Sequence, residues 1–353
     1  MSDVRQDRAR SRGDVDPPSQ WSWARAGQGA HATRLILEED LRMLVEKVTG
    51  YRFERGDDAL AREQAAEHEV MKRRGVAADA SAHKPMTAPP VLARPVLMVP
   101  GLTMAAASFD PMTTQLASTG KNGVVAVYCA ADGQFHAGDV AGPVLTGAAL
   151  AKVKMFQLEY VDPNAGPSQK QAQVGQALAA IQAATGAATV DMVAHSAGGT
   201  DVRLYLEQRQ PGSGPTIGET VLIGPASHGT FMGDVGDKIG KPLGLKQAGA
   251  ELAMHSPLID MLNRRWAHQR GQISGHITII AVGGAPTVGA HGLTDGDGYM
   301  PVNEASMPGA DTIVLQGFDK TPVAHLREVE YSGVIEEVQQ ALARGAVTPG
   351  RPR

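Results

Sequence analysis

The chain has 353 residues, enough to bury one large α/β core with an extension or two modest domains. Its formal net charge of −4 is nearly balanced and gives no indication of a nucleic-acid partner. A single cysteine excludes an intrachain disulfide, and no apolar run approaches the roughly 18 residues of a membrane helix. The charged N-terminus lacks an apolar signal core, so we expect a cytoplasmic protein, or one exported without a signal peptide.

Residues 1–90 differ in character from the rest and are predicted to form a partly disordered N-terminal arm. Within the arm, apolar residues recur at the spacing of one helix face: Leu35, Leu37, Leu41, Leu44, Val45 and Val48. A second, alanine-rich helix is predicted over residues 57–74, and the prolines of residues 75–90 indicate a linker. We expect this helical extension to pack on the main domain, with docking of a partner as the alternative.

From residue 94 onward, predicted strands alternate with predicted helices, a pattern that indicates a mostly parallel sheet. The apolar runs that predict strands cover residues 96–99, 124–129, 190–194, 219–223, 277–282 and 312–316. Helices are predicted from Asp110 to before Gly120 and over 169–184. We expect one α/β domain over residues 91–346 and a tail over 347–353. The Gly- and Pro-rich segment 132–167 is interpreted as an ordinary surface loop, or else as an insertion at the site entrance.

The motif Ala194-His-Ser-Ala-Gly198 lies between an apolar run and a helix-like stretch. A serine at the apex of a strand, turn and helix is the context of a nucleophile turn of the G-x-S-x-G type. The turn requires small residues two before and two after the serine, and Ala194 and Gly198 meet this requirement. Ser196 is therefore the predicted nucleophile.

A serine nucleophile needs a histidine base and an acid, which follow it along the chain on loops after later strands. The predicted loop before the last strand contains Asp295 and Asp297, and chain order favours Asp297. His325 is the only histidine beyond the last predicted strand, which makes it the predicted base. The oxyanion that forms when the serine attacks a carbonyl group needs hydrogen-bond donors. The predicted donors are the backbone N–H groups of Ala197 and of Leu102, which ends the Val99-Pro-Gly-Leu102 turn.

Together these segments resemble bacterial triacylglycerol lipases and related esterases of the α/β-hydrolase superfamily. The resemblance covers residues 94 to about 335. It rests on the oxyanion turn and the nucleophile turn, on Gly224-Pro-Ala-Ser-His-Gly-Thr230, and on the helix-like segment 251–263. It implies an α/β-hydrolase fold with helices on both faces of the sheet.

Several of these lipases bind calcium through an acidic residue two positions after the histidine and a glutamine six after it. Here those positions hold Arg327 and Tyr331, so no calcium site is expected. Residues 233–269 begin with glycines and continue with many apolar residues. This pattern predicts a lid-like insertion, or else a set of helices that belong to the core.

We therefore predict a carboxylic ester hydrolase, lipase-like on acyl lipids, that uses Ser196, Asp297 and His325 with no cofactor or metal. The expected substrate is a small-molecule or lipid ester, with transient contact to a lipid surface. The alternatives are an acyltransferase or short-chain esterase that uses the same residues, and a non-catalytic binding module.

Overall fold

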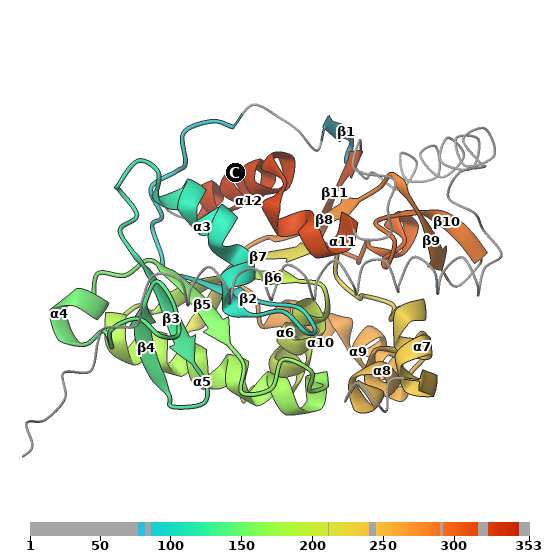
Figure 1. Cartoon of the computed structure of the whole chain (residues 1–353), viewed down its shortest axis with the longest axis horizontal. Helices are drawn as coiled ribbons and strands as arrows, with labels where there is room; N and C mark the ends of the chain where they lie inside the picture. The colour runs from blue at the N-terminus through green and yellow to red at the C-terminus, as the bar shows by residue number, and fades with distance from the viewer. Residues whose placement is uncertain are drawn as a thin grey trace, which may run out of the picture. The chain divides into compact units, whose positions relative to one another are not determined.

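The computed structural model describes residues 77–81, 86–210, 212–239, 245–289, 292–316 and 324–345. Nine of its strands form one sheet in the order β1-β11-β8-β7-β6-β2-β5-β3-β4 (Figure 1). These strands are β1 (Ala77–Ser81), β2 (Val96–Val99), β3 (Val125–Cys129), β4 (Gln134–Ala137), β5 (Met155–Glu159), β6 (Thr189–His195), β7 (Thr216–Ile223), β8 (Ile277–Val282) and β11 (Asp311–Gln316). Every neighbouring pair is parallel except β3 with β4. The predicted mostly parallel sheet is confirmed.

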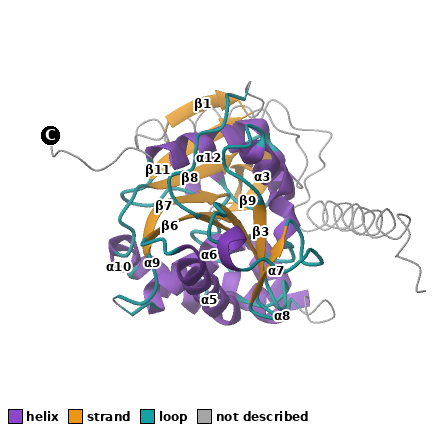
Figure 2. Ribbon diagram, turned by 90° about the vertical axis from the view of Figure 1, so that its left-hand side faces the viewer, coloured by secondary structure: helices purple, strands orange, loops and turns teal. Residues whose placement is uncertain are grey.

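Helices cover both faces of this sheet, as predicted. The α-helices of the described residues are α3 (Asp110–Ala117), α4 (Gly147–Leu150), α5 (Pro167–Thr185), α6 (Ala197–Gln208), α7 (Phe231–Ile239), α8 (Lys246–Leu252), α9 (Pro257–Arg264), α10 (Trp266–Gly271), α11 (Ala324–Arg327) and α12 (Ser332–Arg344). Helices α3 and α12 lie on one face, and α5 and α6 lie on the other (Figure 2). A separate hairpin is formed by β9 (Ala285–Gly289) and β10 (Gly292–Gly296).

The alternation of side chains along each strand explains why two cores form. In β2, Leu97 and Val99 belong to the core under α5 and α6, whereas Val96 and Met98 belong to the core under α3 and α12. Successive side chains of a strand point to opposite faces, so a strand buried on both faces is apolar throughout. All four of these side chains are fully buried.

Two segments expected to lack regular structure contribute strands. Residues 77–81 of the predicted linker form β1, which pairs with β11 at the edge of the sheet. The segment 132–167, interpreted as a surface loop, contains β4 and β5, and β5 lies between β2 and β3 inside the sheet. The surface-loop interpretation is therefore wrong. The predicted helices of the arm and the tail 347–353 lie outside the described residues.

In its described residues, 233–239 and 245–269, the predicted lid corresponds to four helices, α7 to α10, inserted between β7 and β8 (Figure 1). Arg203 of α6 is buried and anchors the second half of the insertion. Its guanidinium donates to Asn263 Oδ1 at 2.8 Å and to Gln269 Oε1 at 3.1 Å, and to the main-chain oxygen of Ser227 at 2.9 Å. Within the described residues, no helix is both long and apolar enough to cross a membrane.

Candidate active site

Ser196 occupies a sharp turn between β6 and α6. Its backbone has φ 55° and ψ −128°, a conformation that side-chain-bearing residues rarely adopt and that stores strain. The N–H of Ser196 donates to the main-chain oxygen of Ile223 at 2.9 Å, which ties the turn to the end of β7. The serine is thus held at the carboxyl edge of the sheet, where ligands of open α/β sheets bind.

Small residues make this turn possible. A Cβ added at Gly198 would lie 2.6 Å from the main-chain oxygens of both Val99 and Pro100. A Cβ at Gly101 would lie 3.0 Å from the Cβ of Ser196. The loop after β2 and the start of α6 therefore approach each other closely because Gly101 and Gly198 carry no side chains at these contacts.

The structure brings the three predicted side chains together. His325 Nε2 lies 2.7 Å from Ser196 Oγ, and His325 Nδ1 lies 2.8 Å from Asp297 Oδ2. A carboxylate can only accept, so Nδ1 carries a proton; in the neutral form of the ring, Nε2 accepts from the serine hydroxyl. His325 and Asp297 are buried, and Ser196 is 9% exposed.

Backbone groups fix the orientation of the Asp297 carboxylate. Its Oδ1 accepts from the N–H groups of Tyr299 and Met300 at 2.8 and 2.7 Å, which leaves Oδ2 for the histidine. The turn uses Gly298 at φ 96°. The alternative acid, Asp295, is directed elsewhere, since it accepts from the N–H of Gly284 at 2.8 Å and from Gln316 Nε2 at 3.0 Å.

A second buried carboxylate lies beside the histidine, and the sequence reasoning missed it. Glu328 Oε2 is 3.4 Å from His325 Nδ1 and 3.1 Å from His195 Nε2. His195 Nε2 also lies 3.0 Å from the main-chain oxygen of His325. Gly224 leaves room for the carboxylate, because a Cβ there would lie 2.1 Å from Glu328 Oε2. Two features of the sequence could have indicated this carboxylate: a glutamate lies about one helical turn after His325, and a histidine directly precedes Ser196.

The two carboxylates govern the protonation of this cluster. Burial acts to lower the pKa of His325, but Asp297 and Glu328 outweigh it and raise that pKa to about 10. Burial raises the pKa of Asp297 to about 6. Burial also acts to raise the pKa of Glu328, yet the charge of His325 and the hydrogen bond from His195 lower it to about 2. The negative field around the imidazole therefore favours a positive charge on it.

The two predicted oxyanion amides belong to the residue after Ser196 and to the loop after β2. Ala197 is the first residue of α6, where a backbone N–H has no partner within the helix. Leu102 precedes Thr103, whose φ of 63° is unusual for a residue with a branched side chain. The N–H of Thr103 donates to the main-chain oxygen of Pro163 at 2.9 Å, which fixes the loop that carries Leu102.

The side chains of His195, His325 and Glu328 offer possible metal-ligand atoms within 4.8 Å of one another. Each of these groups is hydrogen-bonded inside the cluster, and all three are fully buried or nearly so. A cation bound there would break the contacts that orient His325. We therefore assign the cluster to the ordering of the histidine and not to a metal.

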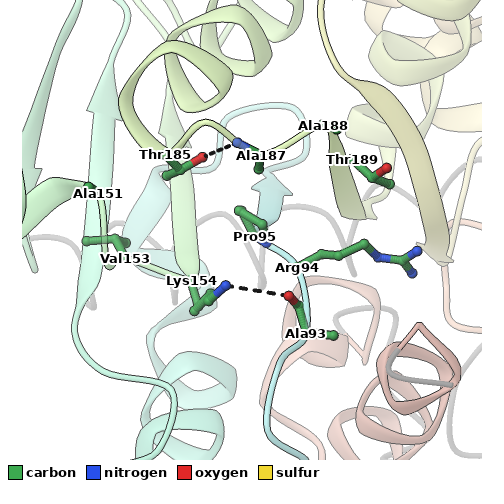
Figure 3. A pocket seen from close by; sticks show the side chains of 10 residues that line it. All are labelled: Ala93, Arg94, Pro95, Ala151, Val153, Lys154, Thr185, Ala187, Ala188 and Thr189. Atoms are coloured by element: carbon green, nitrogen blue, oxygen red, sulfur yellow. Dashed lines mark hydrogen bonds between the residues drawn. The ribbon is translucent and has the colours of Figure 1, made fainter. Parts of the chain in front are cut away.

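A cavity of about 330 Å³ lies at the opposite, amino edge of the sheet (Figure 3). Two cationic side chains line the cavity, but each of them already binds another group of the protein. Lys154 Nζ donates to the main-chain oxygen of Ala93 at 3.5 Å, and Arg94 forms an ion pair with Asp191 at 2.9 Å. This cavity does not contribute to the serine site.

A mostly parallel sheet, helices on both faces and a serine at the apex of a strand, turn and helix define the α/β-hydrolase fold. The predicted fold class is confirmed.

No protein-family model and no curated protein sequence matches the chain. Among solved structures, it is similar to the product of gene lin2722 of Listeria innocua, at 19% identity and a TM-score of 0.47, over 70% of this chain and 93% of that one. It is also similar to mature lipase BlEst2 of Bacillus licheniformis, at 14% identity and a TM-score of 0.46, over 76% of this chain and 99% of that one. It is similar as well to phospholipase PlaB of Legionella pneumophila, at 12% identity and a TM-score of 0.48, over 70% of this chain and 59% of that one. Likenesses this low transfer no residue's role to the present chain.

Proposed function

We propose that the chain is a serine hydrolase that cleaves carboxylic esters through an acyl-enzyme. One observation carries the proposal. A continuous line of hydrogen bonds runs from Ser196 Oγ through the ring of His325 to Asp297 Oδ2, with distances of 2.7 and 2.8 Å. This line aligns a nucleophile, a general base and an orienting acid.

In the first half of the reaction, His325 Nε2 takes the proton of Ser196 as Oγ attacks the ester carbonyl. The tetrahedral oxyanion accepts from the N–H groups of Leu102 and Ala197. The imidazolium then gives its proton to the leaving alkoxide, so an alcohol departs and the acyl group stays on the serine. Asp297 and Glu328 stabilise the positive charge that His325 carries between these two steps.

In the second half, a water molecule takes the place of the alcohol. His325 removes a proton from the water as it attacks the acyl carbonyl, and returns that proton to Ser196 Oγ as the carboxylic acid leaves. Each proton taken from a nucleophile is delivered to a leaving group. The cycle therefore requires no cofactor.

An apolar acyl group suits this site. Buried Ala226, Leu252 and Met300 pack beside Ala197, the residue that follows the nucleophile. Such surroundings favour an uncharged hydrocarbon chain over a polar one. They support the lipase or esterase interpretation of the sequence, in which the substrate is a small-molecule or lipid ester with an apolar acyl group whose length the site limits.

The test is Ser196→Ala, with the exposed Ser213→Ala as the matched control. We expect hydrolysis of p-nitrophenyl butyrate to fall by at least about 10⁴-fold in the first variant and to stay unchanged in the control. A fluorophosphonate probe should label the wild-type chain and not Ser196→Ala. Substantial hydrolysis by Ser196→Ala would overturn the assignment.

A non-catalytic module would show neither hydrolysis nor labelling in the wild type. An acyltransferase would be labelled, but it would form more transfer product than free acid when an alcohol acceptor is added. Comparison of these two products therefore separates hydrolysis from acyl transfer.

A further inference from the structure

Six apolar residues form a small cluster that is separate from the two main cores of the molecule. Four of them are buried and two are partly buried: Ala197, Ala226, Leu252 and Met300, with Leu102 and Tyr299 packed against them. Two members, Leu102 and Ala197, are the residues whose amides we assign to the oxyanion. We call this set the site cluster.

Most of the site cluster comes from the loops that build the catalytic site. Ala226 follows β7, while Tyr299 and Met300 follow Asp297. The Tyr299 ring also stacks on His325, with 4.9 Å between ring centroids. Leu252 differs, because it is the last residue of α8 and the one member of the cluster that belongs to the inserted helices.

Leu252 is seated firmly against the site loops. Its main-chain oxygen accepts from the N–H of Thr230 at 2.8 Å, and Thr230 Oγ1 donates to the main-chain oxygen of Tyr299 at 3.1 Å. A Cβ added at Gly233 would lie 2.5 Å from the carbonyl carbon of Leu252, so the start of α7 packs directly on the end of α8.

The preceding residue, Glu251, holds α8 from its other side. Its Oε2 accepts from the N–H of Ser168 in the first turn of α5 at 2.9 Å, and its Oε1 accepts from Ser168 Oγ. Gln247 Nε2 adds a contact to Glu251 Oε1 at 3.0 Å. A carboxylate at the N-terminus of a 19-residue helix is well placed to satisfy its free N–H groups. Contacts on both sides therefore fix the position of Leu252.

From this packing we infer that Leu252 is a specificity-determining residue that sets the upper length of the acyl group. The inference rests on the proposed ester hydrolysis. An acyl group on Ser196 whose oxygen faces the amides of Leu102 and Ala197 must extend past the side chains of the site cluster. Leu252, only 3% exposed, fills that space, so the site accepts short acyl chains and excludes long ones.

The experiment compares p-nitrophenyl acetate, butyrate, octanoate and decanoate as substrates of the full chain. For the wild type, we expect kcat/KM to be highest for acetate or butyrate and to fall steeply at octanoate. Leu252→Ala should raise the octanoate-to-butyrate ratio of kcat/KM by about tenfold or more, because a few methylenes of space change discrimination on that scale. Leu262→Ala is the matched control, since Leu262 is a fully buried leucine of α9 outside the site cluster.

An unchanged ratio in Leu252→Ala, or a wild-type preference for decanoate, would overturn the inference while the proposed hydrolysis stands. A wild-type chain that neither hydrolyses butyrate nor reacts with the fluorophosphonate would instead overturn the proposed function. If Leu252→Ala does not fold, Leu252→Val carries the same test with a smaller expected rise of the ratio. The ratio of Leu262→Ala should match the wild type.

Discussion

Glu328 lies on the same side of the His325 ring as Asp297, with its Oε2 3.4 Å from Nδ1. The same oxygen lies 3.1 Å from His195 Nε2, so one carboxylate contacts both the proposed base and the residue before the proposed nucleophile. Buried charges persist only where they are paired and hydrogen-bonded. Because Glu328 is fully buried, its negative charge must be balanced by its contacts with His195 and His325.

Glu328→Gln removes the second negative charge while it keeps the shape of the side chain. We expect kcat for butyrate hydrolysis, compared on the alkaline plateau of each variant's pH profile, to fall about tenfold with KM nearly unchanged, because the lost field stabilises the imidazolium and not the bound ester. Asp297→Asn should cost more, about 10⁴-fold, since Asp297 makes the shorter bond to Nδ1. Glu330→Gln, a change on the same short helix η4 (Glu328–Glu330), is the control and should behave as the wild type. A full-rate Glu328→Gln enzyme would show that this charge has no part in the reaction.

The pH dependence of the reaction should reflect the raised pKa of His325. The general base acts in its neutral form, so kcat/KM increases as pH rises through that pKa. Asp297 and Glu328 raise the pKa above the ordinary histidine value of 6.5, which moves the rising limb of the profile toward alkaline pH. In Glu328→Gln the limb should shift back to lower pH. A rising limb below pH 6, unchanged in the variant, would contradict the electrostatic role of Glu328.

The sequence predicts those parts of the fold that depend on local pattern. Mostly apolar runs predict β2, β6 and β8, because strands buried on both faces of a parallel sheet carry few polar residues. The small residues around Ser196 predict its sharp turn. Chain order leaves His325 as the one histidine in the required position.

Features that depend on distant partners are not visible in the sequence. β5 is missed because its short apolar stretch lies within a Gly- and Pro-rich segment. The polar Gln157 inside this strand has a distant partner, since its Nε2 donates to Asp110 Oδ1 at 3.0 Å. Glu328 is missed because it resembles a surface glutamate. Its burial depends on the space left by Gly224, more than a hundred residues earlier in the chain.

The nucleophile turn should be intolerant of a side chain at Gly198. A Cβ in Gly198→Ala would lie 2.6 Å from the main-chain oxygens of Val99 and Pro100, so the backbone of the turn must shift. We expect more than a hundredfold loss of kcat/KM and a decrease of about 2 kcal/mol in the free energy of unfolding. Gly271→Ala, where a Cβ meets no atom within 4 Å, is the control and should change neither value. A fully active Gly198→Ala enzyme would mean that the turn can open without moving Ser196.

The buried guanidinium of Arg203 should contribute strongly to stability. It donates to the loop after β7, to α9 and to α10, and its Cζ lies 5.5 Å from the centroid of the Trp266 ring. Arg203→Met keeps the apolar volume but leaves the acceptors on Asn263 and Gln269 without donors. Each buried polar group left unpaired costs about 1–3 kcal/mol, so we expect the free energy of unfolding in urea to fall by about 3 kcal/mol. Arg209→Met, at the exposed end of α6, is the control, with an expected loss below about 1 kcal/mol. Equal losses in the two variants would show that α9 and α10 are not anchored through Arg203.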